Sequence, residues 1–192
     1  MLGVAAARVN LKWPIGTATV GAHAADNDAR APDPLSRRPR VAMRLLTIVA
    51  TALWLGAMGF FALVVAPAAF GTLEREAAGR LVSAVFPRYY AVGLALGMAA
   101  LLGLGARWTA GAWRGLDWLP LGLVVLMLAL TLYAGAVVLP AAHAAREAMR
   151  QAGVDPSAAA AFARLHRLSG LLNAIVMVSG VVVVVVEMAR RR

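Results

Sequence analysis

Residues 162–180, FARLHRLSGLLNAIVMVSG, combine the composition of a membrane-spanning helix with a stripe of polar and small side chains, and the predicted architecture is built around them. At about 100° per residue, this stripe occupies one side of the helix and aliphatic side chains cover the rest. An amide inside a bilayer is costly unless it has a partner, so the stripe is expected to face protein inside a helix bundle. This polar stripe consists of His166, Ser169, Gly170, Asn173, Met177 and Gly180.

The whole chain has the composition of a membrane protein. Hydrophobic residues make up 61% of its 192 residues, and the mean hydropathy is +0.75. Four long apolar runs are separated by charged segments, which excludes an ordinary soluble domain. The pattern predicts an all-α fold, an integral membrane four-helix bundle, with spans at about 45–70, 90–106, 119–139 and 168–186.

The net charge of +10 comes mainly from arginines that flank the apolar runs. Such arginines set topology and anchor to head groups, whereas a nucleic-acid site would need a basic face with interleaved aromatic residues. We therefore expect contact with the lipid bilayer and none with nucleic acid. The distribution of arginines over the loops favours an orientation with both termini in the cytoplasm. The lack of cysteine in the sequence excludes disulfides, thiolate nucleophiles and cysteine-held metals.

The chain divides into a tail and a membrane domain. Residues 1–42 lack usable periodicity and cannot bury enough apolar surface to offset their ordering, so we expect disorder. Met43 begins a stretch that resembles the natural start of a membrane protein, which favours an upstream extension from a misassigned start. A genuine cytoplasmic tail is the alternative. Residues 43–192 form the predicted four-span domain.

Two helical segments are expected outside the membrane. Between the first two spans, Thr72 is placed to cap a short amphipathic helix, which Pro87 is expected to stop. Glu76 and Arg80 form an i,i+4 pair within it. Between the last two spans, alanine-rich sequence predicts a protruding helical hairpin with its tip near Gly153.

These loops also supply an outer cluster of candidate functional residues. At about 1.5 Å per residue, His143 and His166 lie at similar heights on the two arms of the hairpin, so they are placed to meet. Aromatic and basic residues before the second span suit the membrane interface. The candidate outer-loop cluster consists of Arg88, Tyr89, Tyr90 and His143.

Small residues in the spans indicate where helices pack closely. Glycine lets another backbone approach, and a proline near the outer end of the first span is expected to bend it. The predicted helix-packing positions are Gly56, Gly59, Pro67, Gly93, Gly97, Gly170 and Gly180.

Two segments carry a family resemblance: residues 53–90, LWLGAMGFFALVVAPAAFGTLEREAAGRLVSAVFPRYY, and residues 162–173, FARLHRLSGLLN. In order and spacing they resemble a bacterial member of the transmembrane protein 205-like family, a small four-helix membrane domain of unknown function. The resemblance covers Met43 to about Arg190. It implies an integral inner-membrane protein and no established reaction. The residues that match the family's pattern are Gly56, Phe60, Pro67, Phe70, Gly79, Phe86, Pro87, Tyr89, Tyr90, Phe162, His166, Ser169 and Asn173.

The sequence contains no recognisable catalytic constellation, and we expect no enzyme activity. The intramembrane segments are expected to hold no buried carboxylate pair. Glu187 is interpreted as a solvated helix-end partner of Arg190 rather than as part of a proton relay. His143 and His166 supply few ligands for a metal or haem, so hydrogen bonding of His166 within the outer loops is the favoured interpretation.

One methionine lies near the middle of each span. Thioethers bind Cu(I), which fits a membrane protein of the copper-resistance type. Methionine is also an ordinary core filler, and packing is the favoured interpretation. The four residues are Met58, Met98, Met127 and Met177.

Together these features predict a non-enzymatic inner-membrane protein, with no cofactor, that handles a small molecule or ion or scaffolds membrane partners. His166, Ser169 and Asn173 are its candidate functional stripe. The expected partners are an unidentified small molecule or ion, copies of the same chain, or other membrane proteins. The alternative is a protein that binds copper or haem.

Overall fold

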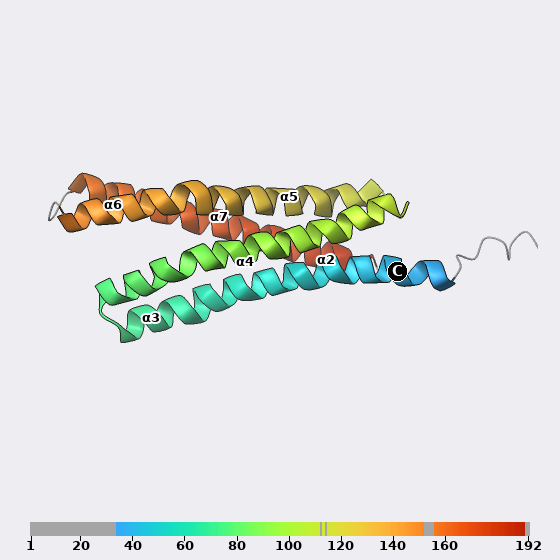
Figure 1. The fold of residues 1–192 in the computed structure, drawn as a ribbon, viewed down its shortest axis with the longest axis horizontal. Helices are drawn as coiled ribbons and strands as arrows, with labels where there is room; N and C mark the ends of the chain where they lie inside the picture. Colours follow the sequence, from blue (N-terminus) through green and yellow to red (C-terminus); the bar gives the residue numbers. More distant parts are fainter. Residues whose placement is uncertain (1–33, 112, 114, 152–155, 191–192) are drawn as a thin grey trace, which may run out of the picture.

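A computed structural model of the protein describes residues 34–111, 113, 115–151 and 156–190. These residues form four long helical runs that pack side by side as a bundle (Figure 1). The predicted all-α four-helix bundle is confirmed, and the described residues contain no strand. Each run is long and apolar enough to cross a membrane, and the four are Pro39–Thr72, Arg75–Thr109, Gly115–Gln151 and Pro156–Ala189.

The first two runs form a hairpin. The first run consists of α2 (Pro34–Phe60), the π-helix η1 (Phe61–Val65) and α3 (Ala66–Thr72). The second run is the single helix α4 (Arg75–Thr109), which packs along α2.

The other two runs form a second hairpin. The third run consists of the short 3₁₀-helix η2 (Gly115–Asp117), α5 (Trp118–Tyr133), the π-helix η3 (Ala134–Val138) and α6 (Leu139–Gln151). The fourth is α7 (Pro156–Ala189), which packs against both α5 and α6. The helical hairpin predicted between spans three and four is therefore present, as a continuation of both spans. Its predicted tip lies outside the described residues.

The end of α3, the start of α4, the end of α6 and the start of α7 lie at the same end of the bundle, which we call the loop end (Figure 1). The start of α2 and the end of α7 lie at the opposite end, the terminal end (Figure 1). The turn between α4 and α5 is also at the terminal end, because α4 begins at the loop end and crosses the whole bundle.

Both π-helices end two residues before a proline, Pro67 in one case and Pro140 in the other. Proline lacks an amide hydrogen, and its ring crowds the carbonyl of the residue four positions earlier, here Leu63 and Ala136. Each of these carbonyls lies inside the π-helix, where the wider turn makes room for the ring. Pro67, predicted to bend the first span, thus follows a widened turn in a helical run that continues to Thr72.

The structure corrects three predicted boundaries. Residues 34–42 were expected to be disordered but form the first turns of α2, and residues 1–33 lie outside the described part of the chain. Thr72 does not cap a following helix, because its Oγ donates to the Ala68 carbonyl at 2.6 Å within α3. Pro87 does not stop a helix either.

Instead, α4 runs without a break from Arg75 through Pro87 and the second span, so the predicted amphipathic helix is the first part of α4. Proline inside a helix costs about 3 kcal/mol. Packing of α4 against the neighbouring runs, on both sides of the proline, offsets this cost. The predicted pair of Glu76 and Arg80 forms, with 2.9 Å between Oε1 and Nη1.

Glycines on α4 let α2 and α5 come close. A Cβ added at Gly93 would lie 2.8 Å from the indole nitrogen of Trp54, and one at Gly97 would lie 2.7 Å from the same indole ring. On α7, a Cβ at Gly180 would lie 2.7 Å from a methyl group of Leu55. These three positions therefore carry close contacts between helices.

The other predicted glycine positions are wrong. A Cβ added at Gly56, Gly59 or Gly170 would have no atom of a neighbouring element within 4 Å. Gly56 and Gly170 are exposed, and the packing between α2 and α4 falls on a different face of α2. That face is formed by Thr47, Ala50, Thr51, Trp54 and Met58, all of which are buried.

Candidate functional site

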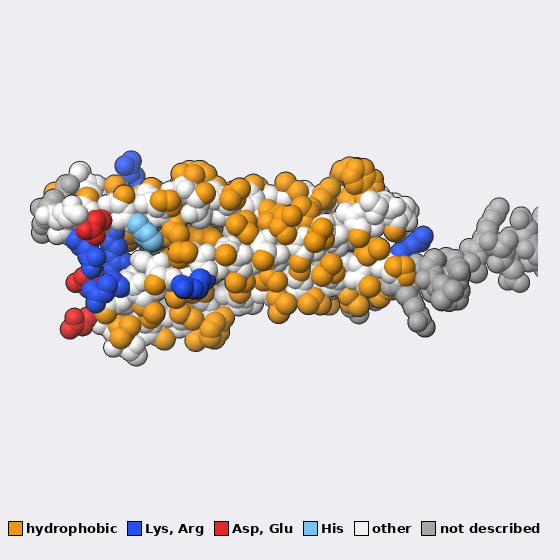
Figure 2. Space-filling model, viewed as in Figure 1, with side chains coloured by type: hydrophobic (Ala, Val, Ile, Leu, Met, Phe, Trp, Pro, Cys, Tyr) orange, Lys and Arg blue, Asp and Glu red, His pale blue; other side chains and the backbone are white. Residues whose placement is uncertain are grey.

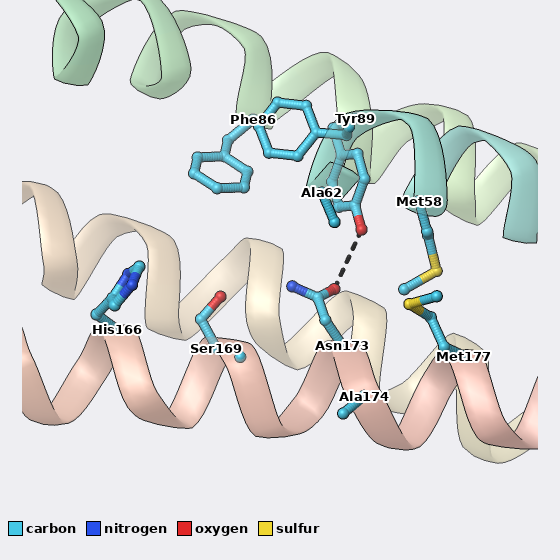
Figure 3. Close-up of a pocket in the computed structure, with 11 residues that line it drawn as sticks. Met58, Ala62, Phe86, Tyr89, His166, Ser169, Asn173, Ala174 and Met177 are labelled. Carbon is cyan, nitrogen blue, oxygen red and sulfur yellow. Dashed lines mark hydrogen bonds between the residues drawn. The ribbon is translucent and has the colours of Figure 1, made fainter. Parts of the chain in front are cut away.

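A pocket of about 290 Å³ lies in the loop-end half of the bundle, between the first helical run, α4 and α7 (Figure 3). Five of the six residues of the predicted polar stripe face it, and Gly180 lies deeper in the bundle. The lining is formed by Met58, Phe61 and Ala62 of the first run, Phe86 and Tyr89 of α4, and His166, Ser169, Gly170, Asn173, Ala174 and Met177 of α7.

Two tyrosines of α4 meet the polar residues of α7. Tyr89 Oη donates to Asn173 Oδ1 at 3.2 Å, which gives the amide the partner that a position within the membrane requires (Figure 3). Tyr90 Oη and Ser169 Oγ lie 3.5 Å apart, and either can donate. The two contacts hold the polar stripe against α4.

The Asn173 amide keeps hydrogen-bonding capacity for a second partner. Its contact with Tyr89 uses the oxygen, and the nitrogen carries two further donors. Figure 3 shows this nitrogen on the side of the amide toward Ser169, along the row of polar side chains. A molecule in the pocket would therefore meet an amide donor and the Ser169 hydroxyl within a lining that is mostly apolar.

Aromatic rings build the wall opposite the polar stripe. The Phe61 ring lies 5.3 Å from the rings of both Phe86 and Tyr89, measured between centroids. Phe86 also stacks on Tyr90, with centroids 5.9 Å apart. Phe61 is the first residue of the π-helix η1, so the widened turn that accompanies Pro67 shapes this wall. Aromatic contacts of this kind fix ring positions.

His166 lies at the outer end of the pocket, nearer the loop end than Ser169 and Asn173 (Figure 3). Its side chain is exposed, and its ring stacks on Phe162 with centroids 6.1 Å apart. His143 lines a separate groove between α4 and α6. The two histidines, whose similar heights placed them to meet, therefore line different surfaces of the hairpin.

The predicted outer-loop cluster does not form a unit. Tyr89 lines the pocket and Tyr90 is buried behind it. Arg88 is exposed and donates to the Ala84 carbonyl of its own helix at 3.1 Å. Because α4 is continuous here, consecutive residues point about 100° apart, and Arg88 is turned away from the site.

The four methionines of the metal hypothesis are not gathered at one site. Met58 and Met177 line the inner end of the pocket, with their side chains directed toward each other (Figure 3). Met127 is fully buried in the adjoining core, whereas Met98 is half exposed on the outside of the bundle. The described residues contain no group of three or more histidine, aspartate or glutamate side chains placed to hold a metal ion.

At the terminal end, the structure contains a buried ionic cluster that the sequence interpretation missed. Glu187 is 0% exposed and Asp117 is 1% exposed, so the expectations of a solvated Glu187 and of no buried carboxylate pair are both wrong. Arg107 Nη1 lies 2.9 Å from Glu187 Oε1, and Arg107 also pairs with Asp117. Arg190 contacts both carboxylates, and Arg44 Nε lies 3.6 Å from Glu187 Oε2.

This buried ionic cluster ties all four helical runs together, since Arg44 belongs to α2, Arg107 to α4, Asp117 to η2 and Glu187 to α7. One signal in the sequence could have indicated the cluster. Opposite charges occur at ends of the apolar runs, and an antiparallel bundle brings these ends together at the same end of the molecule. Charges buried in this way must be paired, which makes the cluster a structural lock for the terminal end.

Comparisons with known proteins agree with the assignment of the chain to a small domain of unknown function. Residues 49–151, just over half of the chain, match the model of a family described as a domain of unknown function, DUF4149. An uncharacterized protein of Aquifex aeolicus (strain VF5) is 35% identical over 99 residues, which cover 51% of this chain and 67% of that protein. No solved structure matches the chain.

The predicted resemblance to transmembrane protein 205-like proteins names a more specific family than these matches do, and it stays a prediction. The match to the family model contains η1 and α4, which form two walls of the pocket, and ends at Gln151, before α7. On the strength of that match, the chain belongs to the DUF4149 family of small domains of unknown function.

Proposed function

We propose that the protein is a non-enzymatic membrane protein that binds a small amphipathic molecule dissolved in the bilayer. The observation that supports this proposal is the pocket in Figure 3, where a row of polar groups on α7 borders an otherwise apolar cavity within the spanning helices. Small-molecule sites commonly combine an apolar lining with a few convergent polar groups. The polar groups present are a hydroxyl, a phenol, an amide and an imidazole.

The lining indicates the class of ligand. Apart from His166 it holds no ionisable side chain other than a phenol, so a charged ligand would lack an opposite charge to offset its desolvation. A neutral molecule with a carbonyl group would accept from the Asn173 nitrogen. At about 290 Å³ the cavity suits a compact ring or the head of a longer apolar molecule.

The route of entry proposed is lateral, from the membrane. Ala62 of the first run and Gly170 and Ala174 of α7 line the pocket and are exposed on the surface of the bundle. All three have small or absent side chains, so lipid-dissolved molecules would pass between these two runs. This arrangement supports ligand binding rather than a packed helix interface at this position.

Filling the pocket at Gly170 is expected to weaken ligand retention strongly. A Cβ at Gly170 meets no neighbouring atom within 4 Å, so a larger side chain can start there, and Gly170→Leu is expected to place apolar atoms in the pocket that this residue lines. The leucine competes with a ligand for the same space, and a steric cost of about 1–3 kcal/mol lowers the affinity about 5- to 150-fold. The loss is measured by extracting lipophilic compounds from the purified protein and quantifying them by mass spectrometry.

Gly56→Leu is the matched control, because Gly56 is also exposed, also has no neighbour within 4 Å and lies outside the pocket. Asn173→Leu tests the polar contact separately. It removes one interhelical hydrogen bond, worth on average about 0.6 kcal/mol in membranes, so the protein should accumulate but retain less ligand. Equal extracts from the wild type, Gly170→Leu and Gly56→Leu at equal abundance would refute the proposal.

A second candidate function is Cu(I) binding at the inner end of the pocket. It is favoured by the approach of Met58 and Met177, whose thioethers are soft ligands suited to Cu(I) (Figure 3). About one copper ion per chain in the purified protein, lost on Met177→Leu, would favour this candidate over a lipophilic ligand. A visible absorption band would instead indicate haem.

We further propose that the protein lies in the inner membrane with both termini in the cytoplasm, which puts the loop end outside. The natural chain has no cysteine, so single cysteines report the orientation directly. Glu74→Cys and Gln151→Cys are exposed at the loop end and should react with a membrane-impermeant maleimide added outside the inner membrane. Ala78→Cys, at a position that is 0% exposed, should stay unlabelled. Labelling of the first two only after the membrane is opened would invert the orientation.

A further inference from the structure

A groove of about 230 Å³ lies between α4 and α6 at the loop end, separate from the pocket. Its lining is rich in arginine and borders hydrophobic surface directly: Figure 2 shows basic side chains gathered at this end of the bundle, with a histidine between them and the hydrophobic side chains. The groove is formed by Arg80, Ser83, His143, Arg146, Glu147 and Arg150.

Arg146 has an unusual place in this groove. Its guanidinium lies directly on Gly79 of α4, so close that a Cβ added at Gly79 would overlap it. Arg146 Nη1 donates to Ser83 Oγ at 3.2 Å, and this partner is neutral. Within the described residues, the guanidinium makes no ion pair. The groove therefore holds a half-buried positive charge in a fixed position without a carboxylate against it.

The other charges around the groove do not cancel this one. Arg80 and Arg150 both contact Glu76, and Arg150 Nη1 also lies 3.7 Å from Glu147 Oε2. Three arginines thus face two carboxylates. The acidic partners are more than half exposed, and exposed ion pairs contribute little stability, so these arginines can turn to another anion at low cost.

We propose that this groove binds the phosphate group of an anionic phospholipid at the membrane surface. Guanidinium groups bind phosphate oxygens in a bidentate manner, and Arg146 is held in place for this by Gly79 and Ser83. His143 and Arg80 line the same groove and add donors. The position favours a lipid over a soluble phosphate, because the groove lies at the end of membrane-spanning helices and next to apolar surface.

Native mass spectrometry of the full chain, titrated with phosphatidylglycerol or with zwitterionic phosphatidylcholine, tests this assignment. The wild type should retain phosphatidylglycerol in preference, and Arg146→Gln should weaken that retention by about tenfold, as expected for the loss of one charge-assisted hydrogen-bonding group. Arg88→Gln is the matched control, because Arg88 is an exposed arginine of α4 that lies outside the groove and hydrogen-bonds to a carbonyl of its own helix.

Gly79→Ala provides an independent variant that keeps every charge. The added methyl group must push the Arg146 guanidinium away, which is the flexible end of its side chain, so α4 itself need not move. Retention should fall as in Arg146→Gln. Equal retention of both lipids by the wild type, or equal weakening in Arg146→Gln and Arg88→Gln, would overturn the proposal. Displacement of phosphatidylglycerol by millimolar inorganic phosphate would overturn the lipid assignment in favour of a soluble anion.

Discussion

Replacing Arg107 by leucine is expected to lower the free energy of unfolding by about 3–5 kcal/mol, the cost of breaking a buried ion pair by removal of one partner. The side chain of Arg107 is 9% exposed and contacts two carboxylates that are almost completely buried. Arg44 and Arg190 remain near Glu187, but they leave the positions occupied by the Arg107 donors empty. Unfolding by sodium dodecyl sulfate in mixed micelles, followed by circular dichroism, measures the loss.

The matched control is Arg80→Leu, since the Arg80 pair with Glu76 is exposed and such pairs contribute at most about 1 kcal/mol. The double variant Arg107→Leu/Glu187→Leu should recover part of the lost stability, because it removes a buried charge together with its partner. A loss in Arg107→Leu no larger than that in Arg80→Leu would contradict the description of the cluster as a structural lock.

Gly103→Ala is expected to be less stable than Gly105→Ala by about 1–3 kcal/mol, the usual cost of overpacking. A Cβ at Gly103 would lie 2.5 Å from Thr47 Oγ and 2.6 Å from the Met43 carbonyl oxygen. The carbonyl belongs to the backbone of α2, so it cannot move without shifting that helix. A Cβ at Gly105 would have no neighbour within 4 Å.

Alanine favours the helical state over glycine by about 1 kcal/mol at either position, so the comparison of the two variants isolates the steric contact. Gly105→Ala should therefore equal or exceed the wild type in stability. The same unfolding assay in mixed micelles applies. Equal stability of the two variants would show that α2 and α4 are less closely packed at Gly103 than described.

The four-helix architecture could be predicted from the sequence, because apolar runs of this length form helices that span a bilayer. The polar stripe on α7 was predictable for the same reason: Asn173 and Ser169 need partners within the membrane, and tyrosines of α4 supply them. The helix boundaries were less predictable, since Thr72 and Pro87 are local signals that tertiary packing overrides. Glycine positions alone also gave wrong predictions of close helix packing, because Gly56 and Gly59 lie on α2 but not on its packed face.

The buried ionic cluster could not be predicted in the same way. Arg107, Asp117 and Glu187 each sit beside the end of an apolar run, where a charged residue ordinarily contacts water and head groups. Nothing local distinguishes them from Arg190, which is partly exposed. Only the antiparallel arrangement of all four runs brings residues 44, 107, 117, 187 and 190 together.

The location of the buried ionic cluster makes the bundle mechanically asymmetric. Charges fasten the four runs at the terminal end, while the pocket lies along α7 toward the loop end. Glu187 and His166 are 21 positions apart on one helix, or about 32 Å at 1.5 Å per residue. A tilt of α7 by about two degrees around the fastened end then moves His166 by about 1 Å and Met177 by about half as much. Such a tilt would widen the outer part of the pocket about twice as much as its inner end.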